Sequence, residues 1–327
     1  LDTRTFDPSQ VDIESICRFF SLGKLKIFQK EKNITLSHSN FYVFASTTRG
    51  NYALKFYPAS SSKDILHEYA LNRYLGLHGF PTPAMLTSSD GKTSVPFCGS
   101  LAVCFEYING QQAWQHIHKK TVQDQINGLM RQLKTVLLPL AGSKFISPQD
   151  SFAAQIKNLI QTASQLTPFY NERNIRKEIN HIAQEFAAHK KLFVRQILHN
   201  NATLTNFMIS KGKVFLLDLS HIKEDYLLSD MTALVLSCRF LRIPPKITKT
   251  MIGEYFLAHG LKKPHQTVLN TQMRLSIIRE YLKNTSREKN LSKARALTTG
   301  QVERYKLYLS QRTKHLVQLL RHLNPAS

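Results

Sequence analysis

Short apolar runs with strand-like spacing fill the first third of the chain. They are rich in Val, Tyr and Phe, residues that favour the pleated, half-buried positions of a sheet. We expect strands at residues 24–28, 41–45, 52–57 and 101–107. Residues 63–77 change to a helical period, and a turn follows at residues 88–92. The first 110 residues therefore predict three strands, a helix and two further strands.

The rest of the chain is mostly helical in its period. Residues 111–193 are expected to form helices, residues 196–219 return briefly to β-rich runs, and the remainder is helical again. A small β-rich part followed by a large helical part predicts an α+β fold with two lobes. We place the lobes at residues 1–108 and 109–327.

The composition suits a folded protein without a membrane-spanning helix. Hydrophobic residues make up 42% of the 327 positions. No apolar run approaches the roughly 18 residues that a spanning helix needs. Four cysteines are scattered without metal-ligand spacing, which favours free thiols in a reducing compartment. We expect a cytoplasmic protein, or one bound peripherally to the inner face of a membrane. The oligomeric state stays open.

Positive charge is in large excess and unevenly spread. The chain has 44 Lys and Arg residues against 22 Asp and Glu, and residues 261–327 hold 14 basic residues and three acidic ones. Such a field attracts phosphate groups, whether on a substrate, on anionic lipid or on nucleic acid. A solvated basic face explains the excess equally well. Nucleic-acid binding ranks last, because no aromatic-rich single-strand motif accompanies the charge.

Residues 299–323 place apolar side chains along one face of a helix, with basic residues among them. The favoured interpretation is an ordinary helix that docks on the rest of the protein. The alternative is a helix that binds a membrane surface or a partner.

The most specific pattern for chemistry lies in residues 196–219. Asn206 precedes a short apolar run, and Asp218 comes twelve residues later, directly after another at residues 214–217. The Lys-Gly-Lys sequence of residues 211–213 predicts the hairpin turn that brings the two side chains together. A carboxylate that closes a buried strand is costly unless it is paired or binds a metal, and Mg²⁺ prefers oxygen ligands. The pattern therefore predicts a magnesium site at Asn206 and Asp218.

A lysine and a glutamate earlier in the chain suit a nucleotide site. Lys55 stands in the third expected strand, and Glu68 follows on the next helix, where it could hold Lys55 by an ion pair. Phosphoryl transfer needs such a cation over the nucleotide phosphates. The alternative for each residue alone is a side chain that points into solvent. Asp230 stands where a helix is expected to begin, so its expected role is a helix cap.

These motifs resemble those of the aminoglycoside phosphotransferase and choline kinase superfamily, a branch of the protein-kinase-like fold. Its members carry His-x-Asp, then Asn five residues on, then an apolar strand that ends in Asp; the matching residues here are His199, Asn201, Asn206 and Asp218. The segments around Lys55, Glu68 and residues 105–110 resemble its small-lobe and hinge elements. The resemblance covers about residues 24–260. Lipopolysaccharide core kinases are a suggested closer relative, from the motifs at residues 217–219 and 230–234.

The resemblance implies a bilobal protein-kinase-like fold and an ATP- and Mg²⁺-dependent kinase. The acceptor would be a hydroxyl group of a small molecule, such as a sugar or amino alcohol, or of a lipid-linked saccharide. It implies catalytic-loop roles for His199 and Asn201, and metal ligation by Asn206 and Asp218. It also implies nucleotide contacts, at Lys55, Glu68, Ser39, Asn40, Glu106, Tyr107 and Ile108.

The catalytic position departs from the family pattern. Where the family has the Asp that takes the hydroxyl proton, this chain has Asn201, whose amide cannot take it. Loss of a positioned general base typically costs about 10²–10⁴ in rate. An engineered replacement, a natural pseudokinase that serves as a binding or scaffold protein, and an enzyme that tolerates Asn all fit. A second departure is that no glycine-rich loop precedes residue 41.

Other catalytic patterns are absent from the sequence. His116 and His118 lack Cys or carboxylate partners at zinc spacing. Neither a Gly-x-Ser-x-Gly motif nor a Walker A motif occurs. The phosphotransferase hypothesis therefore has no rival among these enzyme classes.

Overall fold

The computed structural model describes residues 9–30, 41–141, 152–166, 172–291 and 299–323, which form two compact units. The first unit contains the described residues up to 139 together with residues 204–222. The second contains the described residues of 140–203 and 223–323. The boundaries of these units are not those of the predicted lobes. The lobe boundary between residues 108 and 109 stays a prediction.

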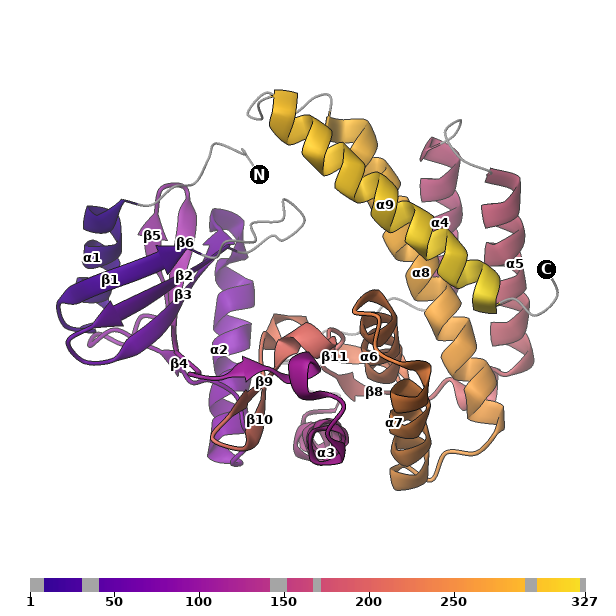
Figure 1. Cartoon of the computed structure of the whole chain (residues 1–327), viewed down its shortest axis with the longest axis horizontal. Helices are drawn as coiled ribbons and strands as arrows, with labels where there is room; N and C mark the ends of the chain where they lie inside the picture. Colours follow the sequence, from indigo (N-terminus) through magenta and orange to yellow (C-terminus); the bar gives the residue numbers. More distant parts are fainter. Residues whose placement is uncertain (1–8, 31–40, 142–151, 167–171, 292–298, 324–327) are drawn as a thin grey trace. The chain divides into compact units, whose positions relative to one another are not determined.

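The first unit combines antiparallel sheets with helices (Figure 1). Its helices in the described part of the chain are α1 (Gln10–Phe19), α2 (Ser62–Leu77) and α3 (Lys120–Leu137). Its strands there are β1 (Leu25–Lys30), β2 (Phe41–Thr47), β3 (Asn51–Pro58), β4 (Met85–Leu86), β5 (Val95–Phe97), β6 (Ser100–Glu106), β7 (Gln111–Gln112), β9 (Phe207–Ser210) and β10 (Lys213–Leu216).

The larger sheet of this unit carries a different core on each face. Its strand order is β1-β2-β3-β6-β4, with β5 paired to β6, and the pairings are antiparallel. Side chains alternate along a strand, so Leu54 and Phe56 of β3 pack in the core that includes α1. Tyr57 lies on the opposite face and packs in the core with Ile65 of α2. Lys55 therefore points to the α2 side of the sheet.

The strands and the helix predicted at stated positions in this region are confirmed, but three strands and not two follow α2 before residue 110, and α1 is an addition. It begins with a capping box: the Asp12 N–H donates to the Ser9 hydroxyl (3.3 Å), and the Ser9 N–H donates to the Asp12 carboxylate (2.9 Å). Ile13, Ile16 and Phe20 then bury one face against the sheet. These signals stand in the sequence, and a search of residues 9–20 for a capped amphipathic helix would find them.

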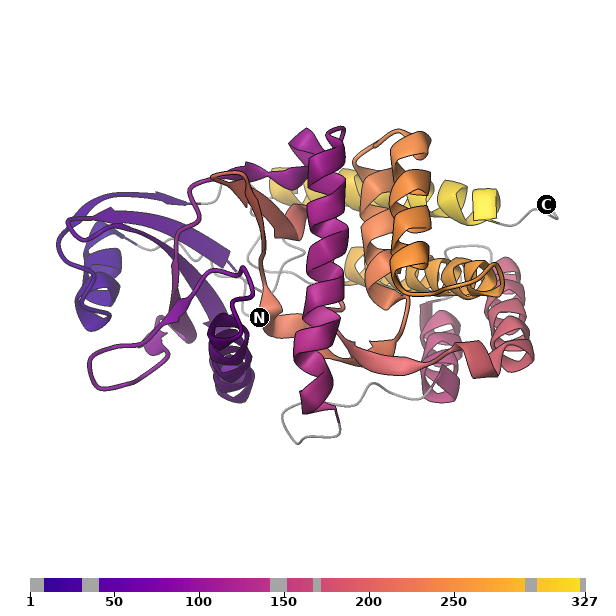
Figure 2. The same cartoon turned by 90° about the horizontal axis from the view of Figure 1, so that it is seen from below.

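The small sheet β10-β9-β7 carries the predicted hairpin. Its turn has positive φ at Lys211 (48°) and Gly212 (76°), as two-residue hairpin turns require. Helix α3 lies beside this hairpin (Figure 2). The chain before β7 passes very close to β9, because a Cβ on Gly110 would lie 2.3 Å from the carbonyl oxygen of Ile209. Only glycine fits there without moving the backbone.

The second unit is mainly helical. Its two strands in the described residues, β8 (Arg195–Leu198) and β11 (Lys223–Tyr226), pair antiparallel. Its helices there are α4 (Phe152–Leu166), α5 (Glu172–Ala188), α6 (Ser229–Phe240), α7 (Pro245–Ala258), α8 (Pro264–Leu291) and α9 (Thr299–Leu323).

Buried contacts join the long helices of this unit. The Arg274 guanidinium of α8 donates to Glu178 and, through Nη1, to Glu185 of α5 (2.9 Å). Helix α9 contacts α8 (Figure 1), and its Leu309 and Leu316 are buried, which supports the docked-helix interpretation. Among the described residues, no helix combines the length and the apolar character needed to span a bilayer.

Candidate active site

Lys55 lies at the centre of a buried ionic cluster in the first unit. Its Nζ donates to Oδ1 of Asp218 (2.7 Å) and to Oε1 of Glu68 (3.4 Å). Lys55 and Glu68 are each only 1% exposed. The alternative of solvent-facing side chains is therefore wrong for both, because β3 and α2 turn them into the same buried space. The structure thus brings together three of the predicted site residues.

Two tyrosines surround the Lys55 ammonium group. The ring centre of Tyr57 lies 4.6 Å from Nζ, and the Tyr57 hydroxyl donates to Glu68. Tyr42 pairs with Lys55 across β2 and β3, with its ring centre 6.0 Å from Nζ. Burial by itself lowers the pKa of Lys55, but Tyr42, Glu68 and Asp218 outweigh it and hold that pKa well above its usual value. Lys55 is therefore a permanent cation at neutral pH.

Asp218 follows β10 in an uncommon conformation. Its φ of 60° places it in the left-handed region, which a residue with a side chain adopts at a cost. The Ser220 hydroxyl donates to Oδ1 (2.7 Å). Burial by itself raises the pKa of Asp218, but the Lys55 charge, with His221 and the hydrogen bonds, holds it well below its usual range. The site thus contains an ionised carboxylate, the kind of group that binds a divalent cation.

Asn206 lies next to Asp218 at the open end of the β9–β10 hairpin. The Leu217 N–H donates to the Asn206 carbonyl (2.8 Å), so the two predicted metal ligands start from neighbouring backbone positions. Among the described residues, no group of three or more His, Cys, Asp or Glu could hold a metal. One carboxylate and one amide leave several positions for phosphate oxygens or water, an arrangement that suits Mg²⁺ bound with a nucleotide. The residues present therefore fit the predicted ion.

The loop with His199 and Asn201 belongs to the second unit, where Asp230 of α6 holds it. The Asp230 carboxylate accepts from the N–H groups of His199 (3.0 Å) and Asn200 (2.7 Å). His199 is completely buried, and Asn201 is half-buried. The expected helix-capping role of Asp230 is wrong, because α6 begins at Ser229 and the carboxylate turns to this loop instead. Its position near a helix start gave no signal for this long-range contact.

Asp230 makes the stability of the protein depend on pH. Burial raises its pKa to about 7, and the two N–H donors lower it by less. The native state therefore holds the proton more tightly than the unfolded chain, where the value is 3.8. The stabilising contribution is complete below the unfolded value and is lost as the pH rises through about 7.

We expect the free energy of unfolding to fall with rising pH by up to about 1.4 kcal/mol per pH unit in this window. Urea denaturation of the wild type and of Asp230→Asn between about pH 5 and 8 would measure it, since the variant has no proton to lose at this position. Parallel curves for the two proteins would contradict the assignment.

The backbone at the end of β6 and the start of the connector after it is hydrogen-bonded to neighbouring segments. The Glu106 N–H donates to the Ala84 carbonyl (2.9 Å), and the Tyr107 N–H donates to the Asn51 carbonyl (3.3 Å). The adenine contact expected from Glu106, Tyr107 and Ile108 stays a prediction. The expected phosphate-loop residues lie outside the described residues; they are Ser39 and Asn40.

Comparison with known proteins identifies the class. Residues 32–250, about two thirds of the chain, match the family described as the Phosphotransferase enzyme family. The chain therefore belongs to this family, and the predicted superfamily is confirmed. No curated protein sequence matches it.

Solved structures share the fold at low sequence identity. An amicoumacin kinase in complex with AMP-PNP and Ca²⁺ is 14% identical, with a TM-score of 0.66, and the match covers 96% of this chain and 97% of that one. A spectinomycin phosphotransferase in complex with ADP is 10% identical, with a TM-score of 0.65 and coverage of 97% and 99%. The choline kinase LicA from Streptococcus pneumoniae is 16% identical, with a TM-score of 0.61 and coverage of 95% and 100%. The expected α+β kinase-like fold is confirmed.

Proposed function

We propose that this chain transfers the γ-phosphoryl group of ATP to a hydroxyl group of a small molecule. The supporting observation is the cluster of the buried Lys55 and Glu68 with the partly buried Asp218, next to Asn206, in a member of a phosphotransferase family. The acceptor oxygen forms a bond to the γ-phosphorus while the bond from that phosphorus to ADP breaks. The hydroxyl proton leaves to solvent, because the amide of Asn201 cannot accept it.

Each residue has a role that its contacts suit. Lys55 places a fixed charge against the nucleotide phosphates, and Glu68 holds it there through a buried ion pair. Asp218 and Asn206 would hold Mg²⁺, which when bound would neutralise charge on the phosphate oxygens. Asn201 orients the acceptor hydroxyl by hydrogen bonding. The buried His199, with Asp230, fixes the loop that carries Asn201.

A second candidate function is a pseudokinase that binds a nucleotide or a partner without turnover. The observation that favours it is Asn201, at the position where the family carries Asp. The first unit retains its ionic cluster regardless of this residue, so nucleotide binding and catalysis are separable properties of the chain.

The proposal extends to the chemical class of the acceptor molecule. Two structurally similar proteins are an amicoumacin kinase and a spectinomycin phosphotransferase, and this similarity favours a small polar acceptor here. The net charge of +22 favours an acceptor that bears negative charge over a polycation. A lipid-linked saccharide at an anionic membrane surface, and a relation to lipopolysaccharide core kinases, remain predictions from the sequence.

Thermal unfolding with ATP and Mg²⁺ tests the site. For the wild type we expect both together to raise the melting temperature, since a ligand at a hundredfold excess over its Kd adds about 2.7 kcal/mol of stability. Asp218→Ala should abolish the Mg²⁺-dependent part of the rise. Asp90→Ala, which removes an exposed carboxylate of the same unit, should keep it. Equal shifts in all three proteins, or none in the wild type, would refute the proposed site.

A further inference from the structure

The hairpin that carries the proposed metal ligands is too short to be stable by itself. Strands β9 and β10 have four residues each, and an isolated pair of strands is at best marginally stable. Asn206 directly precedes the hairpin and Asp218 closely follows it, so a shift or fraying of the hairpin would move both side chains. The two-residue turn sets the register of the two strands, but other elements must keep so short a hairpin formed and in place.

Groups from other elements accept hydrogen bonds from the N–H groups along one edge of the hairpin. In the order β10-β9-β7, β10 is the outer strand, and alternate N–H groups on its free side need acceptors. The Leu216 N–H donates to the carbonyl of Pro81 (3.0 Å). The Val214 N–H donates to the side chain of Gln125 on α3 (2.9 Å). On the opposite side, β7 pairs with β9, directly after the close approach at Gly110.

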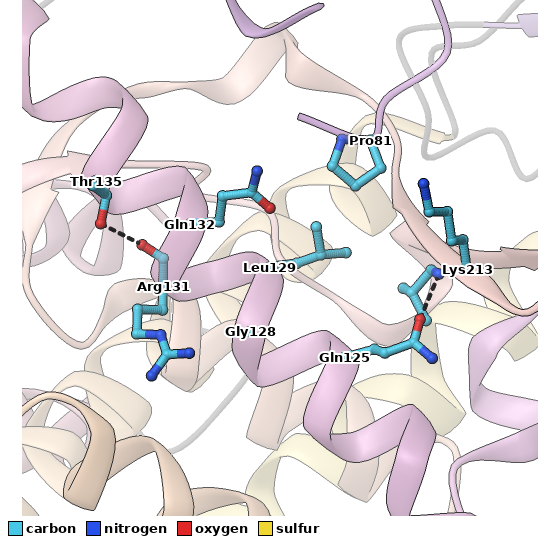
Figure 3. A pocket seen from close by; sticks show the side chains of 9 residues that line it. Pro81, Gln125, Gly128, Leu129, Arg131, Gln132, Thr135 and Lys213 are labelled. Carbon is cyan, nitrogen blue, oxygen red and sulfur yellow. Dashed lines mark hydrogen bonds between the residues drawn. The ribbon is translucent and has the colours of Figure 1, made fainter. Parts of the chain in front are cut away.

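Gln125 contacts the hairpin as a neighbouring strand would. Its Oε1 accepts from the Val214 N–H (2.9 Å), and its Nε2 donates to the Gly212 carbonyl (3.1 Å). A carbonyl and an N–H two residues apart on one edge are the pair that the N–H and C=O of a single residue in an adjoining parallel strand would bind. In Figure 3, Gln125 points from α3 toward the hairpin, on the rim of a shallow depression of about 500 Å³ that Gln132 also lines.

We propose that Gln125 is a positioning residue that sets the metal-binding geometry of Asn206 and Asp218 by holding the edge of their hairpin in place on α3. This inference rests on the proposed function, because it assigns a purpose to that site. Glutamine is the side chain this role requires: a carboxylate would set an oxygen against the Gly212 carbonyl, and an aliphatic side chain would leave both backbone groups unpaired.

Calorimetric titration with AMP-PNP, with Mg²⁺ or with EDTA, tests the proposal on wild type, Gln125→Leu, Gln125→Glu and Asp218→Ala. Gln132→Leu is the matched control, because Gln132 lies on the same helix and lines the same depression. Losing a hydrogen bond of this kind costs a factor of about two to ten. We therefore expect Gln125→Leu to weaken Mg²⁺-dependent binding roughly five- to tenfold, with binding in EDTA unchanged. Gln125→Glu should fall between it and wild type.

Amide hydrogen exchange supplies a readout that does not depend on nucleotide. In Gln125→Leu, the Val214 amide should exchange about tenfold faster or more, while the amides of β3 and β6 keep their rates. Gln132→Leu should match the wild type in both measurements. Equal loss of binding with Mg²⁺ and in EDTA, or wild-type Mg²⁺ dependence with a faster Val214 amide, would overturn the positioning role. Absence of any Mg²⁺-dependent binding in the wild type would refute the proposed function itself.

Discussion

The Asn201→Asp variant should transfer phosphate about 10²–10⁴ times faster than the chain with Asn201. A carboxylate at this position can take the hydroxyl proton as the oxygen attacks phosphorus, whereas an amide can only orient the hydroxyl. Asp230 holds this loop through the backbone N–H groups of His199 and Asn200, and these contacts do not involve the side chain that the substitution changes. The measurement is transfer from γ-labelled ATP to water and to a panel of hydroxyl-bearing acceptors.

Two further variants show whether the gain comes from the proposed site. Asn201→Ala should stay at or below the starting rate, since it supplies neither a base nor a hydrogen bond. Adding Asp218→Ala to Asn201→Asp should remove the gain, because the metal ligand is then missing. If Asn201→Asp binds AMP-PNP with Mg²⁺ but leaves the rate unchanged, the chain is a binding protein and the proposed catalysis is wrong.

The sequence predicted those parts of the site that depend on strand alternation and hairpin pairing. Lys55 falls between two buried apolar residues of β3, so its face follows from the period of the strand. The turn at Lys211 and Gly212 then places Asn206 and Asp218 side by side. Local patterns sufficed for these residues, because strand alternation and a two-residue turn fix where each side chain lies relative to its near neighbours in the sequence.

Long-range contacts could not be predicted in the same way. Asp230 bonds to a loop about 30 positions earlier, and Gln125 bonds to a backbone N–H that lies 89 positions later. Both stand on helices, where polar residues usually face solvent or cap an end. Their partners are main-chain N–H groups, which almost every residue has, so no residue type in the sequence marks them. Only the fold reveals that these two polar residues hold the loops that carry the proposed chemistry.

The Lys55→Met variant should lose both nucleotide binding and about 3–5 kcal/mol of stability. Methionine fills a similar volume, so the loss comes from the charge and not from a cavity. Without the ammonium group, Glu68 is left at 1% exposure, with the Tyr57 hydroxyl as its remaining contact in this cluster. A buried carboxylate that loses its ion-pair partner is strongly destabilising. Urea denaturation would measure the stability, and titration with AMP-PNP and Mg²⁺ would measure the binding.

The double variant Lys55→Met with Glu68→Gln separates the two effects. Glutamine removes the unpaired buried charge and can still accept a hydrogen bond from Tyr57, so we expect a large part of the stability to return. Nucleotide binding should not return, because no cation remains to meet the phosphates. Lys26→Met, an exposed lysine on β1, should change the stability by less than about 0.5 kcal/mol and leave binding intact. Recovery of binding in the double variant would show that the ammonium group of Lys55 does not contact the nucleotide.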